Sequence, residues 1–140
     1  MITNADITIF NKAIGENRRE VFIPTAISGV SWYDVHSVEV SKQQGMAPRD
    51  RAAKFIVRIP LDAKVQDGRT YLPEERYKLL DEEERLRFWT IQLNGYIAKG
   101  THEDIGDLKQ LTGSVGTVVE YADNTVRGSD RVKHWRIGGA

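Results

Sequence analysis

The segment FWTIQLNGYIAKG, residues 88–100, alternates apolar and polar side chains on both sides of an Asn-Gly pair. Alternation with a period of two predicts β-strands that each bury one face. An Asn-Gly pair between two such strands is typical of a type I′ hairpin, in which both turn residues adopt positive φ. The sequence therefore predicts a β-hairpin whose structural turn is Asn94 and Gly95. The predicted cross-strand pairs are Leu93–Tyr96, Gln92–Ile97 and Ile91–Ala98.

Most of the remaining pattern also favours strands. β-branched and aromatic residues concentrate in short runs that Gly, Pro or polar residues interrupt, which is typical of strands joined by turns. Pro24 has no N–H for a ladder hydrogen bond, so the predicted strand that contains it, residues 19–27, is expected to lie at a sheet edge or to bend. The other predicted strands are residues 6–11, 19–27, 29–40, 54–59, 114–121 and 131–137.

Two segments favour helix. Pro73 followed by two glutamates predicts a helix over residues 72–80. Residues 102–111 carry apolar side chains at helical spacing after Thr101, which is a predicted N-cap. The expected fold class is therefore mainly β, a β-barrel or sandwich-like single domain over residues 1–140, with one or two short helices and long loops.

A polar loop, residues 41–53, separates two of the predicted strands. Loops of about a dozen residues are uncommon in compact domains and usually have a function or are disordered. The glutamines and Gly45 favour flexibility, Met46 and Pro48 offer apolar surface, and the charged residues can pair with a neighbour. We therefore expect an inter-subunit or partner contact here, with an idle surface loop as the alternative. The candidate residues are Gln43, Gln44, Met46, Arg49, Asp50 and Arg51.

The composition excludes several classes of protein. The 20 basic and 20 acidic residues cancel, so no global field attracts nucleic acid or an anionic membrane. The absence of cysteine excludes disulfides, thiolate metal sites and cysteine nucleophiles. The N-terminal residues do not have the pattern of a secretory signal. No apolar stretch approaches the length of a membrane span, which is about 18 residues. We therefore expect a cytoplasmic protein with no membrane partner.

No pattern of catalytic residues emerges. His36, His102 and His134 fall on separate predicted elements without metal-ligand spacing. The carboxylate run at residues 81–84 is expected to be a solvated helix end, because a catalytic carboxyl group needs burial to raise its pKa. Gly-rich phosphate-binding loops and a G-x-S-x-G context are missing. We therefore predict a protein that is not an enzyme and that has no cofactor and no metal site.

A single-stranded nucleic-acid-binding β-barrel is an alternative from a different class. Small barrels bind single strands with exposed aromatic residues and a basic groove. Phe55, Trp89 and Tyr96 are the stacking candidates, but they share their predicted faces with Ile, Leu or Val, which favours burial in the core. The basic residues of this alternative are Arg49, Arg51, Lys54 and Arg58.

Short motifs follow one another in an order that covers nearly the whole chain. They are ITIFN, ISGVSWYD, FIVRIP, FWTIQLNGYIAKG, HEDIGDL and VKHWRIGG. This succession resembles small minor-capsid or head–tail joining proteins of tailed phages and prophages of Gram-positive bacteria. In those proteins a strand that ends in Ile-Pro precedes a hairpin, a helix with an acidic start and a terminal strand with His-Trp. The chain departs from that pattern at Asn94, Gly95 and Tyr96, where many relatives have Gly-Asp.

The resemblance implies a structural virion protein that forms a ring at the head–tail joint, as a head-completion or stopper protein. Such a connector ring, sixfold or twelvefold, would close the DNA channel and join the portal and adaptor to the tail. The implied partners are further copies of the chain, portal and adaptor proteins, tail-tube or tail terminator proteins, and the DNA in the channel. A tail terminator or tail-completion protein is the alternative within the same assembly.

Overall fold

Strands make up most of the regular structure in the computed structural model, which describes residues 2–15, 17–35, 53–110, 115–126, 128–129 and 132–140. The strands are β1 (Ala5–Ile14), β2 (Glu20–Asp34), β3 (Phe55–Pro60), β4 (Lys64–Val65), β5 (Thr70–Tyr71), β6 (Phe88–Trp89), β7 (Tyr96–Lys99), β8 (Val115–Asn124) and β9 (His134–Gly139). The α-helices are α1 (Glu74–Tyr77) and α2 (Glu82–Arg85), and the 3₁₀ helices are η1 (Gln66–Gly68) and η2 (Ile105–Gln110).

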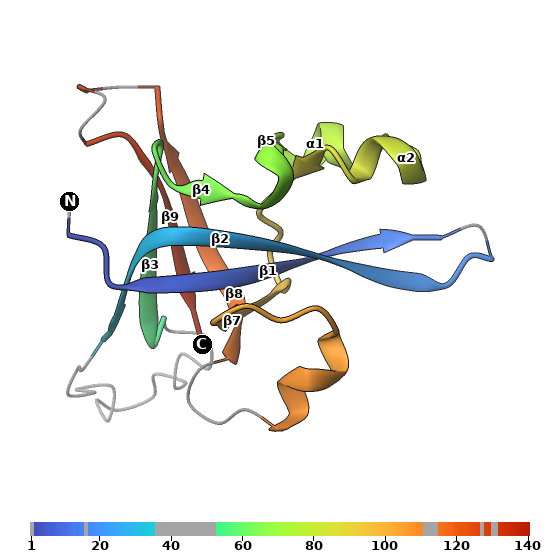
Figure 1. Ribbon diagram of the computed structural model, residues 1–140, viewed down its shortest axis with the longest axis horizontal. Helices are drawn as coiled ribbons and strands as arrows, with labels where there is room; N and C mark the ends of the chain where they lie inside the picture. The colour runs from blue at the N-terminus through green and yellow to red at the C-terminus, as the bar shows by residue number, and fades with distance from the viewer. Residues whose placement is uncertain (1, 16, 36–52, 111–114, 127, 130–131) are drawn as a thin grey trace, which may run out of the picture.

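Six of these strands close into an antiparallel barrel (Figure 1). They neighbour one another in the order β1-β7-β8-β9-β3-β2, and β2 pairs with β1 to complete the circle. The short β4 adds to β2, and β5 pairs with β6 in a separate two-stranded sheet. The prediction of a mainly β fold with short helices is confirmed, and of the two predicted architectures the barrel is the one that forms.

One face of each barrel strand lines the interior. Because successive side chains of a strand point to opposite faces, every second residue of a barrel strand points inward. In β3, Phe55, Val57 and Ile59 belong to the core, while Ile56 on the other face is also buried. The buried core comprises Ile7, Ile9, Ile27, Val30, Trp32, Phe55, Val57, Ile59, Trp89, Ile91, Ile97, Val118 and Ile137.

The Phe55 ring is packed between an aromatic ring and two glycines. It stacks on Trp32 with 4.3 Å between ring centroids and 12° between ring planes. A Cβ atom added to Gly116 or Gly139 would overlap the Phe55 ring. Glycine is therefore required at both positions, because only a residue without a side chain allows this close approach.

The predicted hairpin over residues 88–100 is wrong. Both edges of β7 are used by other strands, since β7 pairs with β1 on one side and β8 on the other. No edge remains for residues 88–93, of which only Phe88 and Trp89 form a strand, parallel to β5. The pairs Leu93–Tyr96, Gln92–Ile97 and Ile91–Ala98 therefore do not form.

The predicted turn is present but lies one residue earlier. The Gly95 N–H donates to the Gln92 carbonyl (3.0 Å), so the central residues are Leu93 and Asn94. Asn94 adopts a φ of 64°, whereas Gly95 is not among the residues with positive φ. Leu93, which alternation places on the same face as Trp89 and Ile91, is 54% exposed, while Gln92 is buried. The alternation of the sequence assigns both side chains to the wrong face.

A single long strand replaces two predicted ones. Residues 19–27 and the first part of residues 29–40 form the 15-residue β2, with Gly29 at a φ of 82° inside it. Residues 36–40 lie outside the described residues. The predicted last strand pair is confirmed as β8 and β9, which are antiparallel neighbours.

The helices are shorter than predicted, and the helix predicted over residues 72–80 is followed by a separate helix, α2. Asp81 caps α2, because the Glu84 N–H donates to Asp81 Oδ1 (2.8 Å) and the Asp81 backbone is extended. This cap separates α2 from α1, so the carboxylate run begins a second helix and does not end the first. The predicted helix over residues 102–111 is the 3₁₀ helix η2, in which Gly106 donates its N–H to Asp104 Oδ1 (2.8 Å).

An aromatic cluster joins the β5–β6 sheet to the barrel. The Tyr71 ring lies 5.0 Å from Trp89 and 5.1 Å from Trp135 of β9, and the two tryptophans lie 5.1 Å apart, all between ring centroids. Burial raises the pKa of Tyr71 to about 12, and the negative charge of Asp123 adds to the effect. The Tyr71 side chain is therefore a neutral phenol in the folded protein.

The stability of the fold is expected to decrease as the pH rises from about 10 to about 12. In this range the unfolded chain loses the Tyr71 proton while the folded chain keeps it, and Tyr77, whose pKa burial also raises, acts in the same direction. Denaturant unfolding at pH 9 and pH 11 measures the change. Tyr71→Phe should weaken the dependence of stability on pH, whereas Tyr33→Phe, at an exposed ring, should not. Equal slopes of stability against pH in the two variants would contradict the assignment of this dependence to Tyr71.

Candidate functional site

Parts of β1 and β2 leave the barrel together as a two-stranded arm (Figure 1). β7 pairs with β1 only as far as Phe10, and β4 and β3 pair with β2 only from Ile27 onward. Residues 11–14 and 20–23, which we call the arm, pair only with each other among the described strands. An open strand edge presents unpaired peptide groups, so both edges of the arm need contacts from elsewhere.

Side-chain amides cover the β1 edge of the arm. The Lys12 N–H donates to Gln92 Oε1 (2.8 Å), and Gln92 Nε2 donates to the Lys12 carbonyl (3.0 Å). Asn11 makes the same double contact with Thr90, donating from Nδ2 to its carbonyl (2.7 Å) and accepting from its N–H (3.2 Å) at Oδ1. Asn11 and Gln92 are buried, so each amide satisfies peptide groups at a position without a neighbouring strand.

Arg69 and Gln66 cover the β2 edge beside the arm. Arg69 Nη1 donates to the Pro24 carbonyl (2.8 Å) and to Thr25 Oγ1 (2.7 Å). The Ala26 N–H donates to Gln66 Oε1 (3.1 Å). Pro24 pairs only with Phe10 of β1, which confirms the prediction that its run lies at an edge. The segment from η1 to the turn at residues 92–95 therefore binds the arm and its base along both edges.

Tyr77 of α1 lies close to residues from both edges. It is 1% exposed, and its hydroxyl has no hydrogen-bond partner among the described residues. Burial raises the pKa of Tyr77, and the guanidinium groups of Arg85 and Arg69 act against this rise. Arg85 Nη1 donates to the Ile14 carbonyl (3.0 Å) at the far end of β1, so α2 also holds the arm.

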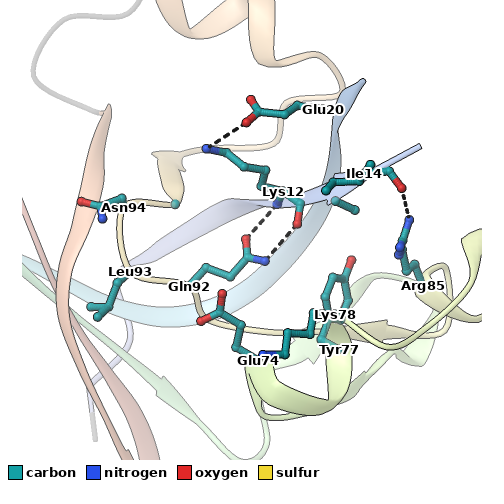
Figure 2. Close-up of a pocket in the computed structure, with 12 residues that line it drawn as sticks. Lys12, Ile14, Glu20, Glu74, Tyr77, Lys78, Arg85, Gln92, Leu93 and Asn94 are labelled. Carbon is teal, nitrogen blue, oxygen red and sulfur yellow. Dashed lines mark hydrogen bonds and ion pairs between the residues drawn. The ribbon is translucent and has the colours of Figure 1, made fainter. Parts of the chain in front are cut away.

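A pocket of about 300 Å³ opens beside the β1 edge of the arm (Figure 2). Three cations and two carboxylates line it, and Lys12 Nζ lies 3.8 Å from a Glu20 carboxylate oxygen. Asn94 and Gly95, the predicted turn residues, are part of its wall. The charged residues are Lys12, Glu20, Glu74, Lys78 and Arg85. Around these charged groups the wall of the pocket is mostly apolar.

Replacing Gln92 by methionine is expected to lower the free energy of unfolding by about 1–3 kcal/mol. Methionine has a similar size but leaves the N–H and carbonyl of Lys12 without their amide partner. Chemical denaturation measures the loss. The control is Gln66→Met, which removes one hydrogen bond at an exposed site and should change the stability by about 0.5 kcal/mol or less. Equal losses in the two variants would contradict the role of Gln92.

The predicted contact loop lies largely outside the described residues. Gln43, Gln44, Met46, Arg49, Asp50 and Arg51 all belong to residues 36–52. The two flanking positions are described, and the Val35 N–H donates to the Lys54 carbonyl (2.7 Å). The chain therefore leaves β2 and enters β3 at adjacent points of the barrel. The function of the loop stays a prediction.

The two histidines that the structure describes, His102 and His134, lie on separate parts of the fold. His102 Nε2 lies 2.9 Å from the Lys99 carbonyl, His134 Nδ1 lies 2.7 Å from the Val132 carbonyl, and His36 lies outside the described residues. In the part of the chain that the structure describes, no group of three or more His, Cys, Asp or Glu is placed to hold a metal ion. Nor does any helix in that part have the length and apolar character of a membrane span.

The aromatic residues of the nucleic-acid alternative are mostly in the core. Phe55 and Trp89 are buried, which confirms the prediction of core packing and removes them as stacking platforms. Tyr96 is half-buried, with its ring centroid 5.7 Å from that of Phe22. Arg58 lies over the Tyr33 ring, 5.4 Å from its centroid. Lys54 is exposed, while Arg49 and Arg51 lie outside the described residues.

The residues that hold the arm have no assigned role in the sequence analysis. They are Asn11, Arg69, Tyr77, Arg85 and Gln92. The available signal is weak. Gln92 is an amide at a polar position of an alternating run, which alternation assigns to solvent, whereas Asn11 shares the strand face of Ile7 and Ile9. Only the point at which β7 stops pairing with β1 shows that an amide is needed beside the arm.

Comparison with known proteins gives a family and no further relative. No curated protein and no solved structure matches the chain significantly. A family model matches residues 2–140, a range that includes the barrel, the arm and the segment that binds it. The chain therefore belongs to the Family of unknown function (DUF6751).

Proposed function

We propose that this protein is a structural virion component of a tailed phage or prophage, and that it forms a ring at the head–tail joint. There it would complete the head as a stopper, closing the DNA channel and connecting the portal and adaptor to the tail. The order of short motifs along the chain supports the proposal. The structural observation that carries it is the arm, which a closed barrel holds in a fixed position.

The arm combines a fixed position with exposed apolar side chains. Ile14 is 64% exposed at its end, and Val21 on the neighbouring strand is also exposed. Grouped apolar side chains on a surface mark sites of protein association. A ring requires each subunit to present the same contact at the same angle. Hydrogen bonds along the β1 edge of the arm and at its base on β2 give the arm that constancy.

Two candidate contact regions lie at opposite ends of β2. The strand runs over 15 residues from the arm toward the predicted contact loop. At 3.2–3.4 Å per residue its length along the chain is about 45–50 Å. A connector ring has neighbours within the ring and partner rings above and below. The separation supports distinct contacts: further copies of the chain on one side, and portal, adaptor or tail proteins on the other.

Co-purification tests this function. We expect the tagged protein to bind the purified portal–adaptor complex of the phage that encodes it. Binding to the tail tube alone would favour the tail terminator or tail-completion alternative. A gene located among metabolic genes, and not beside portal and capsid genes, would contradict a role in the virion.

A further inference from the structure

The sequence contains one Asn-Gly pair, Asn94 and Gly95. Asparagine deamidates most readily before glycine, because glycine has no side chain that shields its amide nitrogen. The other asparagines, at positions 4, 11, 17 and 124, are followed by Ala, Lys, Arg and Thr. The turn at residues 92–95 therefore contains the asparagine of this chain that is chemically most labile.

The backbone of the turn favours both residues of this pair. Asn94 has a φ of 64°, a left-handed conformation that asparagine adopts more often than most other residues. A Cβ atom added to Gly95 would lie 3.0 Å from the Gln92 carbonyl oxygen, so a side chain at this position would strain the turn. The fold therefore selects a labile pair for reasons of geometry.

Three hydrogen bonds hold the backbone of this pair in place. The Asn94 N–H donates to the Val118 carbonyl (2.8 Å), and the Val118 N–H donates to the Gly95 carbonyl (2.8 Å). The Gly95 N–H donates to the Gln92 carbonyl (3.0 Å). Gly95 is buried, whereas Asn94 is exposed. The nitrogen that would attack the Asn94 side chain is therefore inside the turn, with its proton in a hydrogen bond.

We propose that Asn94 is a deamidation site that the folded turn protects and that opening of the turn makes reactive. Hydroxide removes the Gly95 amide proton, and the nitrogen then attacks Asn94 Cγ. A C–N bond forms, the Cγ–Nδ2 bond breaks, and the amide group leaves as ammonia with a proton from water. Water then opens the cyclic imide at either carbonyl carbon and gives aspartate or isoaspartate. Loss of a hydrogen-bonded amide proton requires the same opening as hydrogen exchange, so the open population limits the reaction.

Isoaspartate at this position would loosen the arm. It inserts one additional carbon atom into the main chain between Asn94 and Gly95, so the two hydrogen bonds with Val118 can no longer form together. The carbonyl of Gln92 closes the same turn, and the side chain of Gln92 binds the backbone of Lys12 in the arm. Aspartate keeps the length of the main chain and tolerates a positive φ, so it should leave the turn in place.

Peptide mass spectrometry of the full chain after incubation at pH 8 tests the site. In denaturant, we expect Asn94 to deamidate faster than the other asparagines, which serve as internal controls. In the folded chain the rate at Asn94 should be about tenfold lower or less, and it should follow hydrogen exchange of the Gly95 amide. Equal rates at Asn94 in the folded and unfolded chains, or no preference for Asn94 in denaturant, would overturn the proposal.

Hydrogen exchange at the Lys12 amide tests the effect on the arm. The isoaspartate form, separated by chromatography and refolded, should exchange this amide about tenfold faster or more than the unmodified chain. Asn94→Asp is the matched control, because it adds the charge without the additional carbon, and it should exchange like the unmodified chain. A form that fails to refold would also support the effect, provided that Asn94→Asp refolds.

Two results would overturn the effect on the arm. One is equal exchange of the Lys12 amide in the unmodified, isoaspartate and Asn94→Asp chains. The other is equally fast exchange in the isoaspartate and Asn94→Asp chains, because the added charge would then explain the change. Neither measurement involves a virion or a partner protein, so these outcomes are independent of the proposed function.

Discussion

Phe55→Ala is expected to lower the free energy of unfolding by about 3–5 kcal/mol. The ring stacks on Trp32 and lies directly over Gly116 and Gly139. Its removal leaves a cavity between barrel strands, which glycines cannot fill because they have no side chains. Denaturant unfolding followed by tryptophan fluorescence measures the loss. Phe22→Ala, at a half-buried ring of the arm, is the control and should cost clearly less.

Gly139→Ala examines the same packing from the opposite side. The new methyl group would overlap the Phe55 ring, so the substitution alone should cost about 1–3 kcal/mol. In the Phe55→Ala background the cost should be smaller, because the ring is gone. Gly106→Ala is the matched control, since its Cβ would meet the Asp104 side chain only at 3.4 Å. Additive losses for Phe55→Ala and Gly139→Ala would show that the two sites are not packed together.

Replacing residues 43–51 with a short Gly-Ser linker is expected to leave the fold intact and to abolish incorporation into particles. The Val35–Lys54 hydrogen bond holds the flanking positions together, and loop-closure free energy changes slowly with length. Thermal unfolding of the purified variant tests the first part, and the titre of infectious, DNA-retaining virions tests the second. The control is the same type of linker in place of residues 125–129, which should leave the titre unchanged. A normal titre after the replacement of residues 43–51 would show that the loop is not a required contact.

The barrel strands could be predicted because their patterns are local. Alternation in β3 places Phe55, Val57 and Ile59 in the core, and the structure buries all three. The hairpin at residues 88–100 has an equally regular pattern, yet it does not form. Alternation specifies which face of a strand is buried, but not which strand is its neighbour. β7 pairs with β1 and β8, which are distant in sequence, and this choice leaves residues 90–93 outside any strand.

The arm could not be predicted because its stabilising contacts are long-range. Asn11 binds Thr90 and Lys12 binds Gln92, each across about 80 residues of sequence, and Arg69 binds Pro24 from another segment. In the sequence Gln92 and Arg69 resemble ordinary solvent-facing residues, and nothing local indicates a partner for Asn11. Their burial follows only from the point at which β7 stops pairing with β1. The predicted loop residues stay a prediction, because they lie outside the described residues.

Cryo-electron microscopy of virions from the phage or prophage that encodes this chain is the most direct test of a ring at the head–tail joint. The proposal predicts a sixfold or twelvefold ring between the adaptor and the tail. The six-stranded barrel should fit each subunit of that ring, with its arm directed toward the neighbouring copy. Density at the joint that is accounted for by other proteins, in virions that do not contain this chain, would contradict it.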